Sequence, residues 1–335
     1  MRALSSAAGT RPRCHPGRAV RHRVSCAASP PPPLSEAALK AKTFSVRPDK
    51  LLDTATAAAG FLFRGVSGAV VGGYGARWPR AQVCLRLARC CPPLTAVPPG
   101  VALVDDDGSP GYTVARLGGK RTQESSSAAG WKRPALPLEL YEFQACPFCK
   151  RLREGVNYYD LDVVVYPCPR DGPTWRKKAV ALGGKAQFPL LRDPNTGALM
   201  YESADILQYL ATNYGDGVVP SGLASGLAPL LCGLALLPRA GKGGKYRRSK
   251  VTEATQPVTL WGYEASPFSV LVREALTELE VPHLLRTCAR GSAKRQLMLD
   301  AQGLFQAPLL EDANTGTVMF ESADILQYLD ATYAA

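Results

Sequence analysis

The sequence predicts an α/β protein in which one βαβαββα unit occurs twice in tandem. Residues 138–155 (LELYEFQACPFCKRLREG) align with residues 258–275 (VTLWGYEASPFSVLVREA) at an offset of 120. Further on, residues 188–210 align with residues 307–329 at an offset of 119, and both contain the segment ESADILQYL. This identical run at matching places indicates an internal duplication, so we expect the two copies to share one fold.

Each copy begins with a short apolar strand, predicted over 138–143 and 258–263, that leads into a helix. The helix opens with Cys-Pro-Phe or Ser-Pro-Phe, and proline is favoured there because its missing N–H would have no helical partner. A second strand is predicted over 162–166 and 283–287, with another helix after it. Because such strand–helix–strand connections are right-handed and join parallel strands, the copy is expected to form an α/β layer.

The second half of each copy is predicted to be a hairpin followed by the last helix. The hairpin begins at Pro189 or Pro308, and the Asn-Thr-Gly segments at 195–197 and 314–316 have the chemistry of hairpin turns. Matching residues are expected to stabilise the start of the last helix: Ser203 and Ser322 as N-caps, with Asp205 and Asp324 in the first turn.

Composition divides the rest of the chain. Residues 1–35 contain six arginines and no acidic residue, and they lack an apolar core segment, as in an organellar transit peptide rather than a secretory signal. The predicted parts are a disordered transit peptide (1–45), an apolar, Gly-rich helix pair with an irregular segment (46–137), the first domain (138–215), a linker with an apolar helix packed between the domains (216–257), and the second domain (258–335).

The net charge of +12 does not indicate a nucleic-acid partner, because half of the excess lies in the predicted transit peptide. The next basic cluster lies in a Gly-rich linker without interleaved aromatic residues, which favours a solvated linker. Its members are Arg239, Lys242, Lys245, Arg247, Arg248 and Lys250. The apolar segment 46–79 is interrupted by Asp53 and Arg64, so a membrane span is not favoured, and peripheral membrane association stays open.

Cysteine and histidine counts limit the chemistry. Of ten cysteines, only Cys146 and Cys149 have a Cys-x-x-Cys spacing, and a structural zinc site needs a second such pair or histidines. Once His15 and His22 leave with the transit peptide, His283 is the sole histidine. We therefore expect no metal site, no Ser-His-Asp triad and no Cys-His pair.

The Cys-x-x-Cys pair of the first copy has the position of a redox site. Cys146 lies where a strand ends and a helix begins, facing unpaired backbone N–H groups that favour a thiolate. Lys150, Arg151 and Arg153 are expected to add positive charge. Cys149 follows one helical turn later, close enough to resolve a mixed disulfide at Cys146, so we predict these two as the catalytic residues.

The segments YEFQACPFC, QFPLL and MYESADILQYL resemble the pattern of glutaredoxins and of glutathione transferase N-terminal domains. The tandem arrangement is similar to that of plastid-targeted proteins of plants and algae with two such domains. The resemblance covers residues 138–335, more weakly 43–75. It implies two tandem thioredoxin-like domains, glutathione as co-substrate, and a location in the chloroplast, in the stroma or at a membrane.

The resemblance also implies the residues of a glutathione site. The prolines after the second helix would be cis, with the preceding residue's backbone pairing with the cysteinyl part of glutathione. A Glu-Ser pair at a helix N-terminus would hold the γ-glutamyl end, although plain helix capping is the alternative. The implied residues are Phe188, Pro189, Glu202 and Ser203 in the first copy, and Ala307, Pro308, Glu321 and Ser322 in the second.

The second copy lacks both thiols, because Ser266 and Ser269 replace them. By resemblance to plant transferases, the Ser266 hydroxyl would bind the glutathione thiolate, and a decayed site with Ser266 as a helix cap is the alternative. Cys168 and Cys288 follow the second strands at matching places. Cys168 is either a third redox cysteine near the CPFC pair or a semi-buried structural cysteine.

These observations predict a glutathione-linked thiol–disulfide oxidoreductase whose partners are glutathione and a protein disulfide or glutathionylated substrate. The second domain would be a non-redox copy that binds glutathione or a partner. Two alternatives stay open. One is a non-catalytic tandem binding or assembly module in the plastid; the other is a glutathione transferase or isomerase, for which the large helical domain of transferases is not recognised here.

Overall fold

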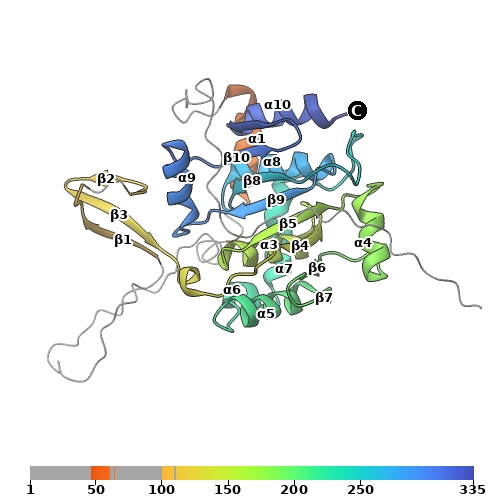
Figure 1. Cartoon of the computed structure of the whole chain (residues 1–335), viewed down its shortest axis with the longest axis horizontal. Coiled ribbons are helices and arrows are strands. Elements are labelled where there is room, and N and C mark those ends of the chain that lie inside the picture. Colours follow the sequence, from red (N-terminus) through yellow and green to blue (C-terminus); the bar gives the residue numbers. More distant parts are fainter. Residues whose placement is uncertain (1–46, 61–63, 65–99, 109–110) are drawn as a thin grey trace, which may run out of the picture.

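The fold is taken from a computed structural model that describes residues 47–60, 64, 100–108 and 111–335 (Figure 1). The predicted transit peptide, residues 1–45, lies outside the described residues, as does much of the predicted helix pair. Of that pair the structure describes the helix α1 (Leu51–Ala59), which follows the 3₁₀ turn η1 (Pro48–Lys50).

Both repeats have the predicted order βαβαββα, which confirms the fold class. The first repeat consists of β4 (Leu138–Glu142), α3 (Pro147–Tyr158), β5 (Asp162–Pro167), α4 (Trp175–Gly183), β6 (Leu190–Arg192), β7 (Leu199–Met200) and α5 (Ser203–Tyr214). The second consists of β8 (Val258–Gly262), α8 (Pro267–Glu278), β9 (His283–Thr287), α9 (Lys294–Gln302), β10 (Leu309–Asp312), β11 (Thr317–Phe320) and α10 (Ser322–Tyr333). In each repeat the first two strands are parallel and the rest antiparallel.

The two repeats form one sheet, with strand order β11-β10-β8-β9-β5-β4-β6-β7. They join where β5 and β9 pair antiparallel, from Asp162 opposite Arg286 to Val165 opposite His283. Figure 1 shows the strands of both repeats side by side through the middle of the molecule. Because each of these strands would otherwise be an exposed edge, the pairing satisfies the backbone of both repeats at once. One apolar core cluster contains residues of both repeats.

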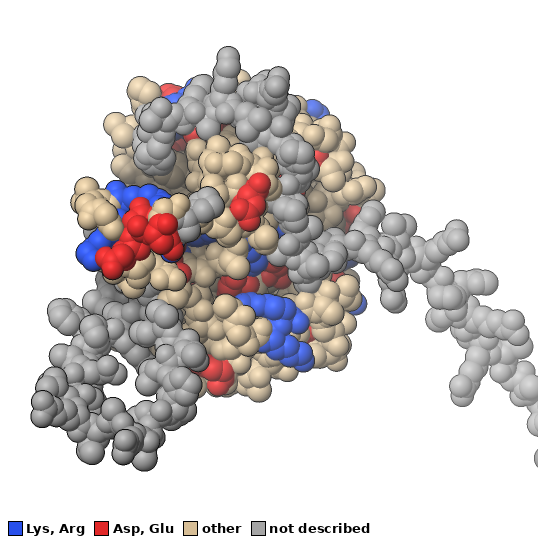
Figure 2. All heavy atoms as spheres, turned by 60° about the vertical axis from the view of Figure 1, so that its left-hand side comes forward, with Lys and Arg blue, Asp and Glu red and all other residues tan. Residues whose placement is uncertain are grey.

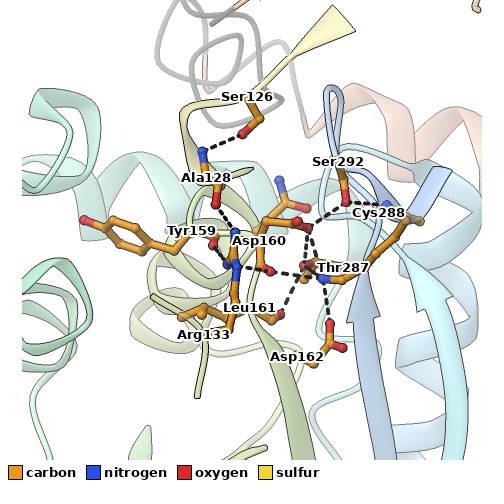
Figure 3. Close-up of polar contacts among 12 residues, drawn as sticks. Ser126, Ala128, Arg133, Tyr159, Asp160, Leu161, Asp162, Thr287, Cys288 and Ser292 are labelled. Atoms are coloured by element: carbon orange, nitrogen blue, oxygen red, sulfur yellow. Dashed lines mark hydrogen bonds and ion pairs between the residues drawn. The ribbon is translucent and has the colours of Figure 1, made fainter. Parts of the chain in front are cut away.

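Each repeat also places a carboxylate on the other one. Asp160 and Glu280 lie at matching positions with positive φ, 52° and 54°. The Asp160 carboxylate accepts hydrogen bonds from Thr287 Oγ1 (3.1 Å) and Ser292 Oγ (2.9 Å) of the second repeat (Figure 3). The Glu280 carboxylate accepts from the backbone N–H of Trp175 (3.3 Å) at the start of α4. The interface therefore has an approximate two-fold symmetry.

The basic cluster is exposed as predicted at Lys242, Lys245, Arg247, Arg248 and Lys250, and the prediction is wrong only for Arg239, which is buried. The linker itself has secondary structure. It forms α6 (Ser221–Ala224), α7 (Ala228–Leu236) and the 3₁₀ turn η4 (Leu237–Arg239), and α7 packs against α3. Arg239 is 5% exposed and pairs with Glu274 on α8 at 2.6 Å. In the same way Arg64, beyond α1, pairs with the buried Glu154 on α3. A buried guanidinium needs a carboxylate, and each helix supplies one.

The prediction of an irregular segment within residues 46–137 is wrong for the described residues 100–108 and 111–137. β1 (Gly100–Asp105), β2 (Arg116–Leu117) and β3 (Lys120–Ser125) form a separate sheet in the order β1-β3-β2, followed by the 3₁₀ turn η3 (Ser127–Gly130). Acidic and basic side chains lie side by side on it (Figure 2), and its ion pairs include Lys120–Asp105 (2.7 Å). β3 (KRTQES) contains no apolar residue, so a search for a hydrophobic pattern does not find it, whereas β1 (GVALVD) has an apolar run that the prediction missed.

The last helices begin at their predicted cap residues, which is one residue earlier than predicted. Ser203 and Ser322 are the first helical residues, and the N-cap residues are Glu202 and Glu321. Neither glutamate makes a side-chain cap hydrogen bond. Across the described residues, no helix is long and apolar enough to cross a membrane.

Candidate thiol site

Cys146 is the N-cap residue of α3, as predicted. Its backbone is extended (φ −90°, ψ 124°), its Sγ accepts a hydrogen bond from the backbone N–H of Cys149 at 3.2 Å, and Pro147 begins the helix. On its other side the Sγ lies 4.0 Å from the carbonyl oxygen of Phe188. The residue is 5% exposed. The thiol therefore lies between a helix N-terminus and the loop that leads to Pro189.

The two thiols of the pair are perturbed in opposite directions. A hydrogen bond from the Cys149 side chain, together with its backbone N–H and the charge of Arg153, lowers the pKa of Cys146 despite burial. Burial, and then the same hydrogen bond, raise the pKa of Cys149 well above its usual value. Cys146 is thus the more acidic thiol and Cys149 the proton-bearing donor, and the catalytic roles of the two residues stay a prediction.

Of the three cations predicted near the thiol, only Arg153 acts on it directly. Lys150 is turned to a carboxylate of the second repeat, Glu264, at 2.8 Å. Arg151 donates to the carbonyl oxygen of Leu223 at the linker helix α6, at 2.6 and 2.8 Å. Successive side chains on a helix point in different directions, so cations that are close in sequence do not all lie near the same group.

The peptide bonds Phe188–Pro189 and Ala307–Pro308 are both cis, as predicted. The Phe188 ring packs against Phe143 with ring centroids 6.0 Å apart, and the guanidinium of Arg176 lies over it at 4.7 Å. Arg176 was not among the predicted site residues. The sequence does mark this arginine, because the second copy has Arg295 at the matching place, 119 residues later.

Glu202 and Ser203 follow the hairpin beside this loop but differ in exposure. Glu202 is exposed, has a positive φ of 63°, and accepts a hydrogen bond from Gln187 Nε2. A positive φ is costly for a residue other than glycine and often marks a functional site. Ser203 is buried, and Arg151 lies 3.5 Å from its Oγ. The aligned pair of Gln306 and Glu321, which has a φ of 70°, repeats this arrangement.

The second repeat keeps the frame of the site without the thiols. Ser266 is the N-cap residue of α8, and its Oγ accepts from the backbone N–H of Ser269 at 3.2 Å. In the same repeat, Arg295 donates to Tyr112 Oη (2.7 Å) and to Glu124 (3.1 Å), from the segment that contains β3. The helix-cap role of Ser266 is thereby established, and a contact to glutathione stays a prediction.

Cys168 and Cys288 fit the structural alternative. Both are fully buried, and burial raises the pKa of Cys168 well above its usual value and that of Cys288 to about 12. The Cys168 Sγ donates to the carbonyl oxygen of Tyr166 at 3.4 Å. A buried, protonated thiol that donates to a carbonyl oxygen two residues earlier is a poor redox partner.

A cavity of about 390 Å³ lies elsewhere, between the two repeats and the segment 126–134. Its lining includes Arg133, Asp160, Asp162 and Lys294. Arg133 donates to the carbonyl oxygen of Tyr159 at 2.6 Å, and Lys294 pairs with Asp162 at 2.7 Å. Lys294 is thus paired with carboxylates and Arg133 with backbone carbonyl oxygens, and no cysteine lines the cavity.

The comparison with protein families decides the type of domain. The family model described as glutathione S-transferase, N-terminal domain, matches residues 140–217 and again residues 260–335. The chain carries two tandem glutathione S-transferase N-terminal domains. Their thioredoxin-like fold is the one described above. Each match begins within the first strand of a repeat, at residue 140 in β4 and at residue 260 in β8.

Two solved structures are similar to parts of the chain. A glutathione transferase of Bombyx mori is 22% identical with a TM-score of 0.24, over 27% of this chain and 42% of that enzyme. A trimeric glutathione transferase of Leishmania is 15% identical with a TM-score of 0.21, over 59% of this chain and 69% of that enzyme. No curated protein matches the chain.

Proposed function

We propose that the chain is a glutathione-linked thiol–disulfide oxidoreductase of the plastid, with Cys146 as nucleophile and Cys149 as resolving cysteine. The observation that carries the proposal is the environment of the Cys146 sulfur. It accepts the Cys149 N–H at a helix N-terminus and lies 4.0 Å from the carbonyl of the residue before a cis-proline. The glutathione S-transferase N-terminal domains support glutathione as the co-substrate.

The chemistry is thiol–disulfide exchange. The Cys146 thiolate attacks the glutathione sulfur of a glutathionylated protein, so that a Cys146–glutathione disulfide forms and the protein thiolate leaves and takes up a proton. A second glutathione thiolate then attacks the glutathione sulfur of that mixed disulfide, releases oxidised glutathione and restores the Cys146 thiolate. Alternatively, the Cys149 thiol loses its proton and attacks Cys146, which releases glutathione and leaves a Cys146–Cys149 disulfide for two further glutathione molecules to reduce.

Substitution of each thiol in the full chain tests the proposal. Cys146→Ser should abolish glutathione-dependent reduction of a glutathionylated peptide, because the attacking sulfur is gone. Cys149→Ser should retain reduction of the same peptide, because that route needs only Cys146. Cys168→Ser, which replaces the buried cysteine after β5, is the control and should leave the rate unchanged. Undiminished activity of Cys146→Ser would show that the nucleophile is another residue.

A second candidate, the non-catalytic assembly module, is favoured by one observation. Cys146 is 5% exposed, so a protein disulfide meets little of its surface. The same assay separates the two functions, since a wild-type chain that binds glutathione or a partner without any turnover would support the module.

A further inference from the structure

A buried ion cluster links the second repeat to the helix of the thiol pair. Glu264 lies in the loop between β8 and α8 and is 4% exposed. Its carboxylate pairs with Arg273 (2.7 Å), Lys150 (2.8 Å) and Arg153 (3.5 Å), and its backbone N–H donates to Asn157 Oδ1 (3.1 Å). Two of these three cations, and Asn157, belong to α3. A residue of the second repeat is therefore fixed directly against the helix of the first repeat's thiols.

Arg153 connects this cluster to the reactive sulfur. Its guanidinium donates to the Glu142 carboxylate and to the carbonyl oxygen of Gln144 (3.1 Å), and its side chain is 1% exposed. The charge of Arg153 favours the Cys146 thiolate, whereas the charge of Glu142 opposes it. Any carboxylate that neutralises Arg153 therefore weakens its effect on Cys146.

The pairing of Lys150 with Glu264 is not a remnant of the duplication. Glu264 aligns with Gln144, and Lys150 aligns with Val270, so neither charge is present at the matching place in the other copy. A carboxylate at position 144 would lie two residues before Cys146 and would disfavour its thiolate. In the second repeat the same carboxylate meets the α3 cations from across the interface.

We propose that Glu264 is a positioning residue of the second repeat for the Cys146 thiol, which holds Arg153 and Lys150 and limits the positive potential that Arg153 exerts on the sulfur. The proposal rests on the proposed function in one respect, that Cys146 is the nucleophile. The second repeat then sets the reactivity of the first repeat's thiol without carrying a thiol at its own site.

The groups around the sulfur and the carboxylate determine the sign of the effect. Burial opposes ionisation of Glu264, but the charges of Arg273, Lys150 and Arg153 outweigh it and lower its pKa to about 2, so it is ionised near neutral pH. The charged and titratable groups that face this cluster are Glu142 from β4, Cys149, Lys150, Arg153 and Glu154 from α3, Cys232 from α7, Arg273 and Glu274 from α8, His283 from β9, and Arg64 beyond α1. Glu264 pairs with three of the cations, Lys150, Arg153 and Arg273. Removing its charge therefore makes the electrostatic potential around Arg153 more positive.

The test is the pH dependence of Cys146 alkylation by iodoacetamide in the full chain, followed by mass spectrometry on the peptide that carries Cys146. Glu264→Gln should lower the pKa of Cys146 by about one unit. Lys150→Val, which installs the residue of the second repeat, should raise it by a similar amount, because Glu264 then neutralises Arg153 more fully. A folded Glu264→Gln chain with an unchanged or raised Cys146 pKa would overturn the proposal.

Glu274→Gln is the matched control, because Glu274 is a buried carboxylate on α8 whose partner, Arg239 at 2.6 Å, belongs to the linker. It should lower the melting temperature without moving the Cys146 pKa, and an equal shift there would also overturn the proposal. If Glu264→Gln does not fold, Lys150→Val decides by the direction of its shift. Alkylation needs no glutathione, so a chain without reductase activity would refute the proposed function and leave this measurement valid.

Discussion

Removal of the Cys149 thiol should raise the pKa of Cys146 by about one unit. The Cys149 side chain is the largest of the groups that lower this pKa, ahead of its own backbone N–H and of Arg153. A hydrogen bond to a charged group contributes about 1.5–3 kcal/mol. A thiol is a weak donor, so the low end applies, and 1.5 kcal/mol corresponds to about one pKa unit. Cys149→Ala retains the backbone N–H at 3.2 Å and loses only the side-chain donor.

The assay is the alkylation rate of Cys146 as a function of pH in the full chain. Below the pKa, Cys149→Ala should react about tenfold more slowly than the wild type, because the thiolate fraction falls by that factor. Cys149→Ser is the matched control: its hydroxyl can still donate a hydrogen bond, so its shift should be smaller. Equal pKa values in Cys149→Ala and the wild type would refute the assignment of Cys149 as the donor.

Two further predictions concern the joined repeats. Burial lowers the pKa of His283 to about 4, below the value near 6.5 that a histidine has in an unfolded chain. The contribution of the neutral imidazole to the free energy of unfolding is therefore fully present above pH 6.5 and is lost as the pH falls toward 4. The free energy of unfolding should fall by about 3 kcal/mol over this range. His283→Val installs the residue of the aligned position, Val163, and should remove this pH dependence when urea unfolding is compared at pH 7 and pH 4.5. An unchanged pH dependence in the variant would contradict the prediction. Residues 258–335 alone should not fold as a monomer, because β9 loses its partner strand β5. Circular dichroism and gel filtration check this, and a folded monomer of that fragment would show that the repeats are independent.

Much of the site could be predicted because its parts are local. A Cys-Pro-Phe-Cys segment after a strand specifies an N-capped helix, since Pro147 cannot donate to a preceding turn and the Cys146 sulfur lies within reach of the freed N–H groups. The strands, hairpins and last helices follow from short-range patterns that are repeated twice. The cis peptide bonds at Pro189 and Pro308 were implied by the family resemblance and are present.

The partners of charged side chains could not be predicted in this way. Arg239 was assigned to a solvated linker and is buried against Glu274, and Lys150 was assigned to the thiol and is turned to Glu264. Both carboxylates lie in the second repeat. A local sequence pattern does not predict which distant helix or strand a long charged side chain contacts, because this depends on how the elements pack.

By itself the sequence determined the duplicated βαβαββα unit, the position of the thiol pair at a helix N-terminus and the loss of both thiols in the second copy. Only the tertiary structure decided that β5 and β9 pair, so that two domains share one sheet, and that Glu264 faces the helix of Cys146. The physical reason is range. Helix caps and turns act over a few residues, whereas strand edges and buried charges are satisfied by whichever partner the whole fold brings to them.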